Sequence, residues 1–238
     1  MIPQLLLDAL RPVTLVVGHY GVGKTNFSVN LALDLASAGR RVSIIDLDIV
    51  NPYFRASEQR RVLEDHGVEL IAPVFAEVGT SLDVPSLTGK VAPAMEMASG
   101  EHPVIVDVGG DDAGSIALGR YARIIRDQDY AMLAVLNRFR NLVQDPADAI
   151  ENLREIETAC GLKATALVDN SHLKSATDTD AVRKGLDYAK TVETMSALPL
   201  VAVTVPKATL QNDCPTIESL VEPNCLYPIT THVKTPWE

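Results

Sequence analysis

The residues best suited to chemistry form one segment near the start of the chain, Gly18-His19-Tyr20-Gly21-Val22-Gly23-Lys24-Thr25. Its spacing, Gly-x4-Gly-Lys-Thr, is typical of a P-loop, which holds the phosphates of a nucleoside triphosphate together with magnesium. Glycines allow positive φ angles, so successive backbone amides can turn toward one anion. We expect nucleotide contacts from this segment and from Asn26, which follows it. The alternative interpretation is a chance glycine-rich turn.

Two side chains of this segment have distinct expected roles. Lys24 is expected to reach the β- and γ-phosphates, which makes it a candidate catalytic residue, and Thr25 is expected to bind magnesium through its hydroxyl group. A helix that begins near Lys24 would add the positive end of its dipole to the same anion site.

A carboxylate that faces this loop is predicted at Asp107. It ends the apolar run Val104-Ile105-Val106, and Val108-Gly109-Gly110 follows it. An aspartate after a buried strand and before glycines is typical of the Walker B carboxylate, with a flexible sensor of the γ-phosphate behind it. Asp107 is therefore a predicted catalytic residue and metal ligand, and Gly110 a predicted nucleotide contact. A strand-end turn in which Asp107 accepts backbone hydrogen bonds is the alternative.

A second pair of carboxylates, Asp46 and Asp48, ends the run Ile44-Ile45-Asp46-Leu47-Asp48. Residues two apart on a strand point the same way. One of them could hold magnesium through water while the other orients the attacking water. Asp48 is the stronger candidate for a catalytic residue and metal ligand, and a polar strand end without function is the alternative.

These residues need a scaffold, and the chain predicts a doubly wound α/β fold. Apolar, β-branched runs that read as strands alternate with helical patterns, and the strand runs are apolar throughout, as in a parallel sheet covered on both faces. We expect one nucleotide-binding domain over residues 1–238, with an irregular C-terminal tail from about Pro206. The expected strands are Val13–Val17, Val42–Asp46, Glu69–Ala72, Val104–Val108, Ala131–Leu136, Ala164–Val168 and Leu200–Val203. The expected helices are Lys24–Ala38, Ser57–Asp65, Pro93–Ser99, Ser115–Arg126, Pro146–Cys160 and Asp180–Met195.

The composition is that of a soluble globular protein, with 47% hydrophobic and 22% charged residues. A net charge of −10 argues against broad electrostatic binding to nucleic acid or to anionic lipid. No apolar run reaches the roughly 18 residues of a membrane helix, and the N-terminus lacks the pattern of a signal peptide. The three cysteines have no CxxC spacing, which excludes an obvious disulfide framework or zinc site. A cytoplasmic location is expected.

The P-loop, the Ile44–Asp48 run and the Val104–Asp107 run together resemble the MinD/ParA-type ATPases, a branch of P-loop proteins that includes the nitrogenase iron protein. The resemblance covers roughly residues 13 to 206. It implies a magnesium–ATP site at the interface of a nucleotide-dependent homodimer, slow ATP hydrolysis and a switch that drives a protein partner. By position, Asp48 matches the switch I aspartate, Asp107 the Walker B aspartate, and Gly109 and Gly110 switch II.

The chain departs from this family at the start of the P-loop. The family's loop begins Lys-Gly-Gly, and that signature lysine reaches across the dimer to the partner's nucleotide, whereas His19 and Tyr20 stand here. An imidazole is a weaker and pH-sensitive substitute for the lysine, so His19 is either a substitute or a simple loop residue.

The resemblance also bears on which base is bound. The guanine-reading pattern Asn-Lys-x-Asp does not occur in the chain. Asn170 follows the run Ala164–Val168, where the family often places an asparagine near adenine, and Pro206 follows the last strand run, where a proline-containing loop covers the base. ATP is therefore expected rather than GTP, although Asn170 as a turn residue is the alternative.

The partner and the reaction stay open at the level of sequence. A nucleotide-dependent switch on an unidentified protein is the first hypothesis. An ATP-dependent ligase or kinase acting on a small acid, a GTP-using metal-insertion accessory protein, and a nucleotide-binding protein with hardly any turnover are the alternatives. Arg138 or Arg140, after another predicted strand, could contact an anionic ligand or a neighbouring subunit, or form an exposed basic loop.

Overall fold

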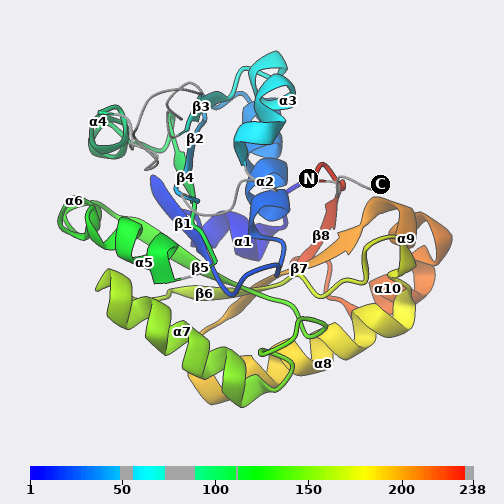
Figure 1. The fold of residues 1–238 in the computed structure, drawn as a ribbon. Helices are drawn as coiled ribbons and strands as arrows, with labels where there is room; N and C mark the ends of the chain where they lie inside the picture. Colours follow the sequence, from blue (N-terminus) through cyan, green and yellow to red (C-terminus); the bar gives the residue numbers. More distant parts are fainter. Residues whose placement is uncertain (49–55, 73–88, 111, 234–238) are drawn as a thin grey trace, which may run out of the picture.

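A computed structural model of the chain describes residues 1–48, 56–72, 89–110 and 112–233. Its centre is an eight-stranded sheet in the order β3-β2-β4-β1-β5-β6-β7-β8, and every neighbouring pair is parallel (Figure 1). The predicted α/β class is confirmed. The strands are β1 Val13–Val17, β2 Ser43–Asp46, β3 Glu69–Ile71, β4 Val104–Asp107, β5 Tyr130–Leu136, β6 Ala166–Asp169, β7 Leu200–Pro206 and β8 Leu226–Ile229.

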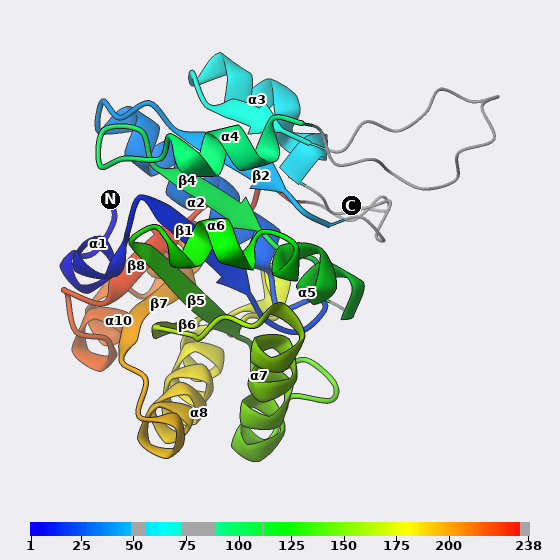
Figure 2. The same ribbon diagram turned by 90° about the vertical axis from the view of Figure 1, so that its left-hand side faces the viewer.

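Helices cover both faces of this sheet (Figures 1 and 2). Helix α2 packs on β1, β2 and β4, α8 packs on β6 and β7, and α7 lies between α5 and α8. The central strands are buried along their whole length, because helices shield them on both sides. The α-helices are α1 Gln4–Ala9, α2 Lys24–Ser37, α3 Arg60–Asp65, α4 Val91–Glu96, α5 Asp112–Gly119, α6 Ala122–Arg126, α7 Pro146–Cys160, α8 Thr179–Ser196, α9 Lys207–Asn212 and α10 Cys214–Leu220, with short 3-10 turns η1 Ala56–Gln59 and η2 Lys174–Ala176.

The expected irregular tail from Pro206 is wrong. The chain continues through α9 and α10 and returns to the sheet as β8, which pairs with β7. The prolines occupy positions that tolerate them: Pro206 precedes the first turn of α9, Pro215 lies in the first turn of α10, and Pro228 lies on the edge strand β8. A high proline content therefore marked the element boundaries and a sheet edge, and not an absence of structure.

Two smaller differences concern helices. The single helix expected over Ser115–Arg126 is two helices, α5 and α6, because the chain turns at Arg120 and Tyr121. Helix α1 was not predicted, and Leu6 is its buried anchor. Within the described residues, no helix is both long enough and apolar enough to cross a membrane.

The strand order determines where the chemistry lies. Strand β1 lies between β4 and β5. Strands β2, β3 and β4 lie on one side of it, and β5 to β8 lie on the other side. In open parallel sheets, ligands bind beyond the carboxyl ends of the strands where the order reverses in this way. The loops after β1, β4, β5, β6 and β7 all meet at that edge.

Candidate functional site

The predicted phosphate loop connects β1 to α2. Gly18, Gly21 and Gly23 have φ angles of 141°, 77° and 92°, which side chains with a Cβ adopt rarely. Gly23 is the N-cap of α2 in the left-handed conformation, and no side chain caps the helix. The first amides of α2 are therefore available to an anion at the positive end of the helix dipole.

The lysine and the threonine of the motif both point into this loop region. Lys24 is buried, with 7% of its surface exposed, and its Nζ donates a hydrogen bond to the His19 carbonyl at 3.1 Å. The Thr25 hydroxyl donates to Oδ2 of Asp107 at 2.7 Å, and the Ser28 hydroxyl donates to Oδ1 of the same carboxylate at 3.2 Å. The structure thus brings together the predicted magnesium ligands Thr25 and Asp107 from separate elements.

Three carboxylates gather beside Thr25. Asp46 of β2 lies opposite Asp107 of β4 in the sheet register, and the Asp48 amide donates to Oδ1 of Asp46 at 3.0 Å. All three are buried. Burial first, and then the negative charge of Asp46, raise the pKa of Asp107 to about 7. A buried cluster of acids like this is stabilised by a cation.

Magnesium fits these residues. It prefers oxygen ligands, keeps several waters and takes other ligands from substrate phosphates, so one hydroxyl and one or two carboxylates suffice. Where the structure describes the chain, no three His, Cys, Asp or Glu side chains converge as a complete metal centre. The protein side of such a site would therefore be Thr25 and Asp107, with Asp48 nearby, and phosphate oxygens and waters would complete it.

Gly110 lies directly against the phosphate loop. A Cβ built on Gly110 would be 2.6 Å from the Lys24 Nζ and 2.6 Å from the Tyr20 backbone nitrogen. The loop after β4 therefore touches the loop after β1, and any side chain at position 110 would push them apart. This contact connects the carboxylate strand to the phosphate loop.

Asn170 holds the phosphate loop from the other side. Its Nδ2 donates to the Val22 carbonyl at 2.7 Å, and its Oδ1 accepts from the Thr204 hydroxyl at 2.5 Å, with 1% of the residue exposed. A Cβ at Gly23 would lie 2.2 Å from the Asn170 Nδ2, so a glycine is required there. Thr204 on β7 was not predicted, since one threonine in an apolar strand run gives no signal of function.

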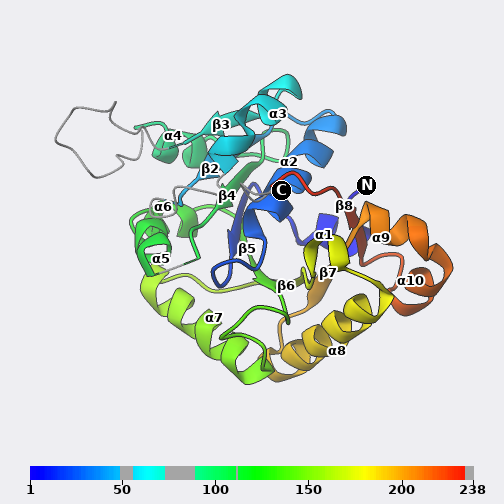
Figure 3. The same cartoon turned by 45° about the vertical axis from the view of Figure 1, so that its right-hand side comes forward.

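The two other predicted nucleotide contacts outside the loop's core lie apart from each other. Asn26 bonds to the segment 230–233 beyond β8, with Nδ2 donating to the Thr230 carbonyl at 3.1 Å and Oδ1 accepting from the His232 amide at 2.8 Å. The chain after β8 runs beside α2 (Figure 3). Asn30, one turn later, exchanges two hydrogen bonds with Thr230. Pro206 ends β7, next to β6, the strand that Asn170 follows. In this structure the Asn26 side chain is thus bonded to the C-terminal segment.

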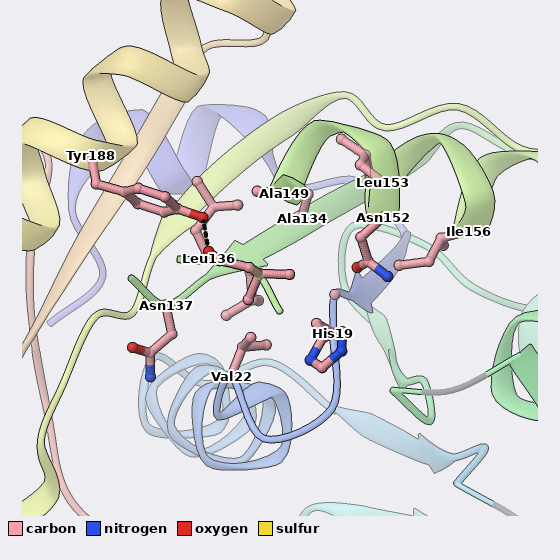
Figure 4. Close-up of a pocket in the computed structure, with 13 residues that line it drawn as sticks. His19, Val22, Ala134, Leu136, Asn137, Ala149, Asn152, Leu153, Ile156 and Tyr188 are labelled. Atoms are coloured by element: carbon pink, nitrogen blue, oxygen red, sulfur yellow. Dashed lines mark hydrogen bonds between the residues drawn. The ribbon is translucent and has the colours of Figure 1, made fainter. Parts of the chain in front are cut away.

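His19 borders a small cavity behind the loop (Figure 4). The cavity measures about 20 Å³, enough for about one water molecule, and lies between the loop, the end of β5 and helix α7. The Tyr188 hydroxyl donates to the Val143 carbonyl at its edge, while the buried Nδ2 of Asn137 has no hydrogen-bond partner among the described residues. The His19 Nδ1 lies 3.0 Å from the Tyr20 carbonyl oxygen.

A comparison with known families settles which group the chain is in. The domain described as CbiA, the CobQ/CobB/MinD/ParA nucleotide binding domain, matches residues 13–176. The chain belongs to this family. It is therefore a P-loop nucleotide-binding protein of the MinD/ParA type, and the resemblance read from its motifs is confirmed. The match includes the phosphate loop, Asp107 and Asn170.

Individual known proteins resemble the chain over a short segment or in their fold alone. Antiactivator FleN of Pseudomonas aeruginosa is 50% identical over 46 residues, which is 18% of this chain and 16% of FleN. FtsY, the signal recognition particle receptor of Elizabethkingia anophelis, in a complex with GDP, has a TM-score of 0.53 at 20% identity over 92% of this chain and 69% of its own. Signal recognition particle 54 kDa protein of Aeropyrum pernix K1, also with GDP, has a TM-score of 0.52 at 18% identity over 80% of this chain and 40% of its own. These two structures share the fold.

Proposed function

We propose that this family member binds magnesium–ATP, hydrolyses it slowly and acts as a nucleotide-dependent switch on a protein partner. The observation that carries the proposal is the hydrogen bond from Thr25 to Asp107, because it joins the two predicted magnesium ligands beside the buried ammonium group of Lys24. Magnesium bound there would neutralise charge on the phosphates. Lys24 would orient the β- and γ-phosphates, and Asp48 would position the attacking water.

ATP is proposed over GTP because of the residues that follow Asn170. In the pattern Asn-Lys-x-Asp, the final carboxylate reads guanine, and the corresponding position three residues after Asn170 is Leu173. Its side chain is 45% exposed and offers no acceptor for the guanine N–H groups. Pro206, on the neighbouring strand, is the proposed cover of the adenine.

A homodimer and a separate protein partner are proposed from the residues that border this site. Tyr20 in the loop is 53% exposed, and Leu142, after β5, is 79% exposed with a φ of 70°. Large apolar side chains around a polar site favour contact with another protein surface. FleN, by its name an antiactivator, is a relative over a short segment, which favours a regulatory partner as the object of the switch.

The experiment is a calorimetric titration with magnesium and a slowly hydrolysed ATP analogue, repeated with the GTP counterpart. Lys24→Ala should abolish binding, while Asp48→Ala should keep binding and remove hydrolysis. Preferential GTP binding would overturn the adenine assignment and favour a GTP-using accessory protein. Hydrolysis at the normal rate in Asp48→Ala would overturn the role of Asp48. Turnover that depends on a small acid would favour a ligase or kinase.

A further inference from the structure

The loop that follows β5 is held in one conformation by its own backbone. The Arg140 amide donates to the Asn137 carbonyl at 3.1 Å, the Val143 amide donates to the Arg140 carbonyl at 3.3 Å, and the Phe139 amide donates to Oδ1 of Asn137 at 3.0 Å. Leu142 in the same loop has a positive φ, which a non-glycine residue adopts at a cost. The position of Arg140 is therefore built into the fold.

The side chain of Arg140 extends over the phosphate loop. A Cβ built on Gly21 would lie 3.3 Å from the Arg140 Nε, 3.4 Å from its Cζ and 3.7 Å from its Cδ. The guanidinium group thus lies against the space that a side chain at position 21 would take, so that such a side chain would crowd it. Gly21 has a φ of 77°, a backbone conformation that favours glycine.

No carboxylate neutralises this guanidinium among the described residues, since none of their ion pairs includes Arg140. Its charge acts on a neighbour: burial first, and then the positive charges of Arg140 and Lys174, lower the pKa of His172 to about 4. His172 lies next to Gly23, and a pKa of about 4 leaves it uncharged at neutral pH. Arg140 is therefore a half-buried cation with no counter-ion among the residues that the structure describes, and such a cation favours an anionic ligand.

We propose that Arg140 contacts the phosphates of the nucleotide bound by its own P-loop and supplies there the positive charge that the family takes from its signature lysine, whose position His19 occupies in this chain. This inference rests on the proposed nucleotide binding. An arginine suits the task because its planar fork presents several donors to phosphate oxygens and keeps its charge at all physiological pH values. Because Arg140 belongs to the same chain, a single subunit would have this charge before any dimer forms.

The test compares Arg140→Ala, Arg140→Lys and the control Arg138→Ala, which removes an exposed arginine of the same loop. Affinity for the magnesium complex of the ATP analogue is measured by calorimetry at low and high salt, and thermal unfolding checks that each variant is folded. Loss of a charged hydrogen bond predicts roughly a tenfold or greater loss of affinity in Arg140→Ala. Arg140→Lys should fall in between, and Arg138→Ala should match the unaltered chain.

The outcomes separate this inference from the proposed function. If the unaltered chain binds the analogue and Arg140→Ala binds it equally well, Arg140 is a packing residue and only this inference fails. If Arg138→Ala and Arg140→Ala lose affinity equally, the effect belongs to the net charge of the loop, and the specific contact is refuted. If the unaltered chain binds neither the ATP analogue nor its GTP counterpart, the proposed function and this inference fail together. A loss confined to Arg140→Ala that shrinks at high salt supports the phosphate contact.

Discussion

Replacement of Asn170 by alanine tests whether the phosphate loop depends on a single buried amide. The change removes the donor to the Val22 carbonyl and the acceptor of the Thr204 hydroxyl, and both of those residues are at most 3% exposed. A buried polar group left without a partner costs about 1–3 kcal/mol. With two such groups and partial relaxation, we expect Asn170→Ala to lower the free energy of unfolding by about 2–4 kcal/mol.

A matched control is Thr204→Val, which keeps the shape of the threonine and the bond from Asn170 to Val22. It should lower the free energy of unfolding by only about 1–2 kcal/mol and leave nucleotide affinity almost unchanged. Urea unfolding of both variants gives the stability, and titration with the ATP and GTP analogues gives the affinity. Asn170→Ala should lower affinity for both analogues by the same factor, because the loop itself is loosened.

Two results would refute this reasoning. A stability loss in Asn170→Ala no larger than that in Thr204→Val would mean that the bond to the Val22 carbonyl contributes nothing. A loss of affinity for the ATP analogue alone would mean that Asn170 acts on the base, and not through the loop. The second result would support the adenine contact that the family resemblance implies.

Three further predictions concern the carboxylate, the loop contact and the C-terminal segment. Since burial raises the pKa of Asp107 to about 7, the folded ligand-free chain retains a proton that the unfolded chain loses near pH 4. The free energy of unfolding should therefore fall as the pH rises from about 4 to 7. Asp107→Asn should flatten this dependence on pH, which urea unfolding at pH 5, 6 and 8 would measure. Gly110→Ala should weaken nucleotide binding at least roughly tenfold in calorimetry, because the added Cβ would collide with the backbone of the phosphate loop and with the P-loop lysine. The control Gly100→Ala should bind normally, because a Cβ at that position has no atom within 4 Å. Asn30→Ala breaks both bonds to Thr230 and should lower the free energy of unfolding by about 1–3 kcal/mol in urea, with no change meaning that the segment beyond β8 adds no stability.

Local patterns explain how much of the fold could be predicted. The apolar runs that became β1, β4 and β5 are continuous and bounded by turn residues, and helix α7 was predicted with its observed bounds because Asp145 and Pro146 mark its start and Gly161 its end. The P-loop was readable because its chemistry depends on consecutive residues. Its spacing fixes both the positions of the glycines, which determine the backbone conformation, and the positions of the side chains that bind phosphate and magnesium.

What the sequence did not reveal depends on pairs of distant residues. The Asn26 side chain bonds to the segment beyond β8, and no local pattern links positions 204 residues apart. Arg140 likewise lies close to Gly21 only because β5 lies beside β1 in the sheet. The prediction of an irregular tail was wrong for a related reason. Strand β8 acquires its conformation by pairing with β7 and not from its own proline-containing sequence.

The position of β1 in the middle of the sheet has a consequence for synthesis on the ribosome. The hydrogen bonds that hold the loop and its helix join residues 82, 148 and 204 positions apart. At about 5–20 residues per second, the last of these partners is translated on the order of 10–40 s after the loop itself. During that interval the nascent chain carries the complete phosphate-binding motif while its distant partners are added one after another. The loop and α2 therefore acquire their full set of hydrogen bonds only when translation is nearly finished.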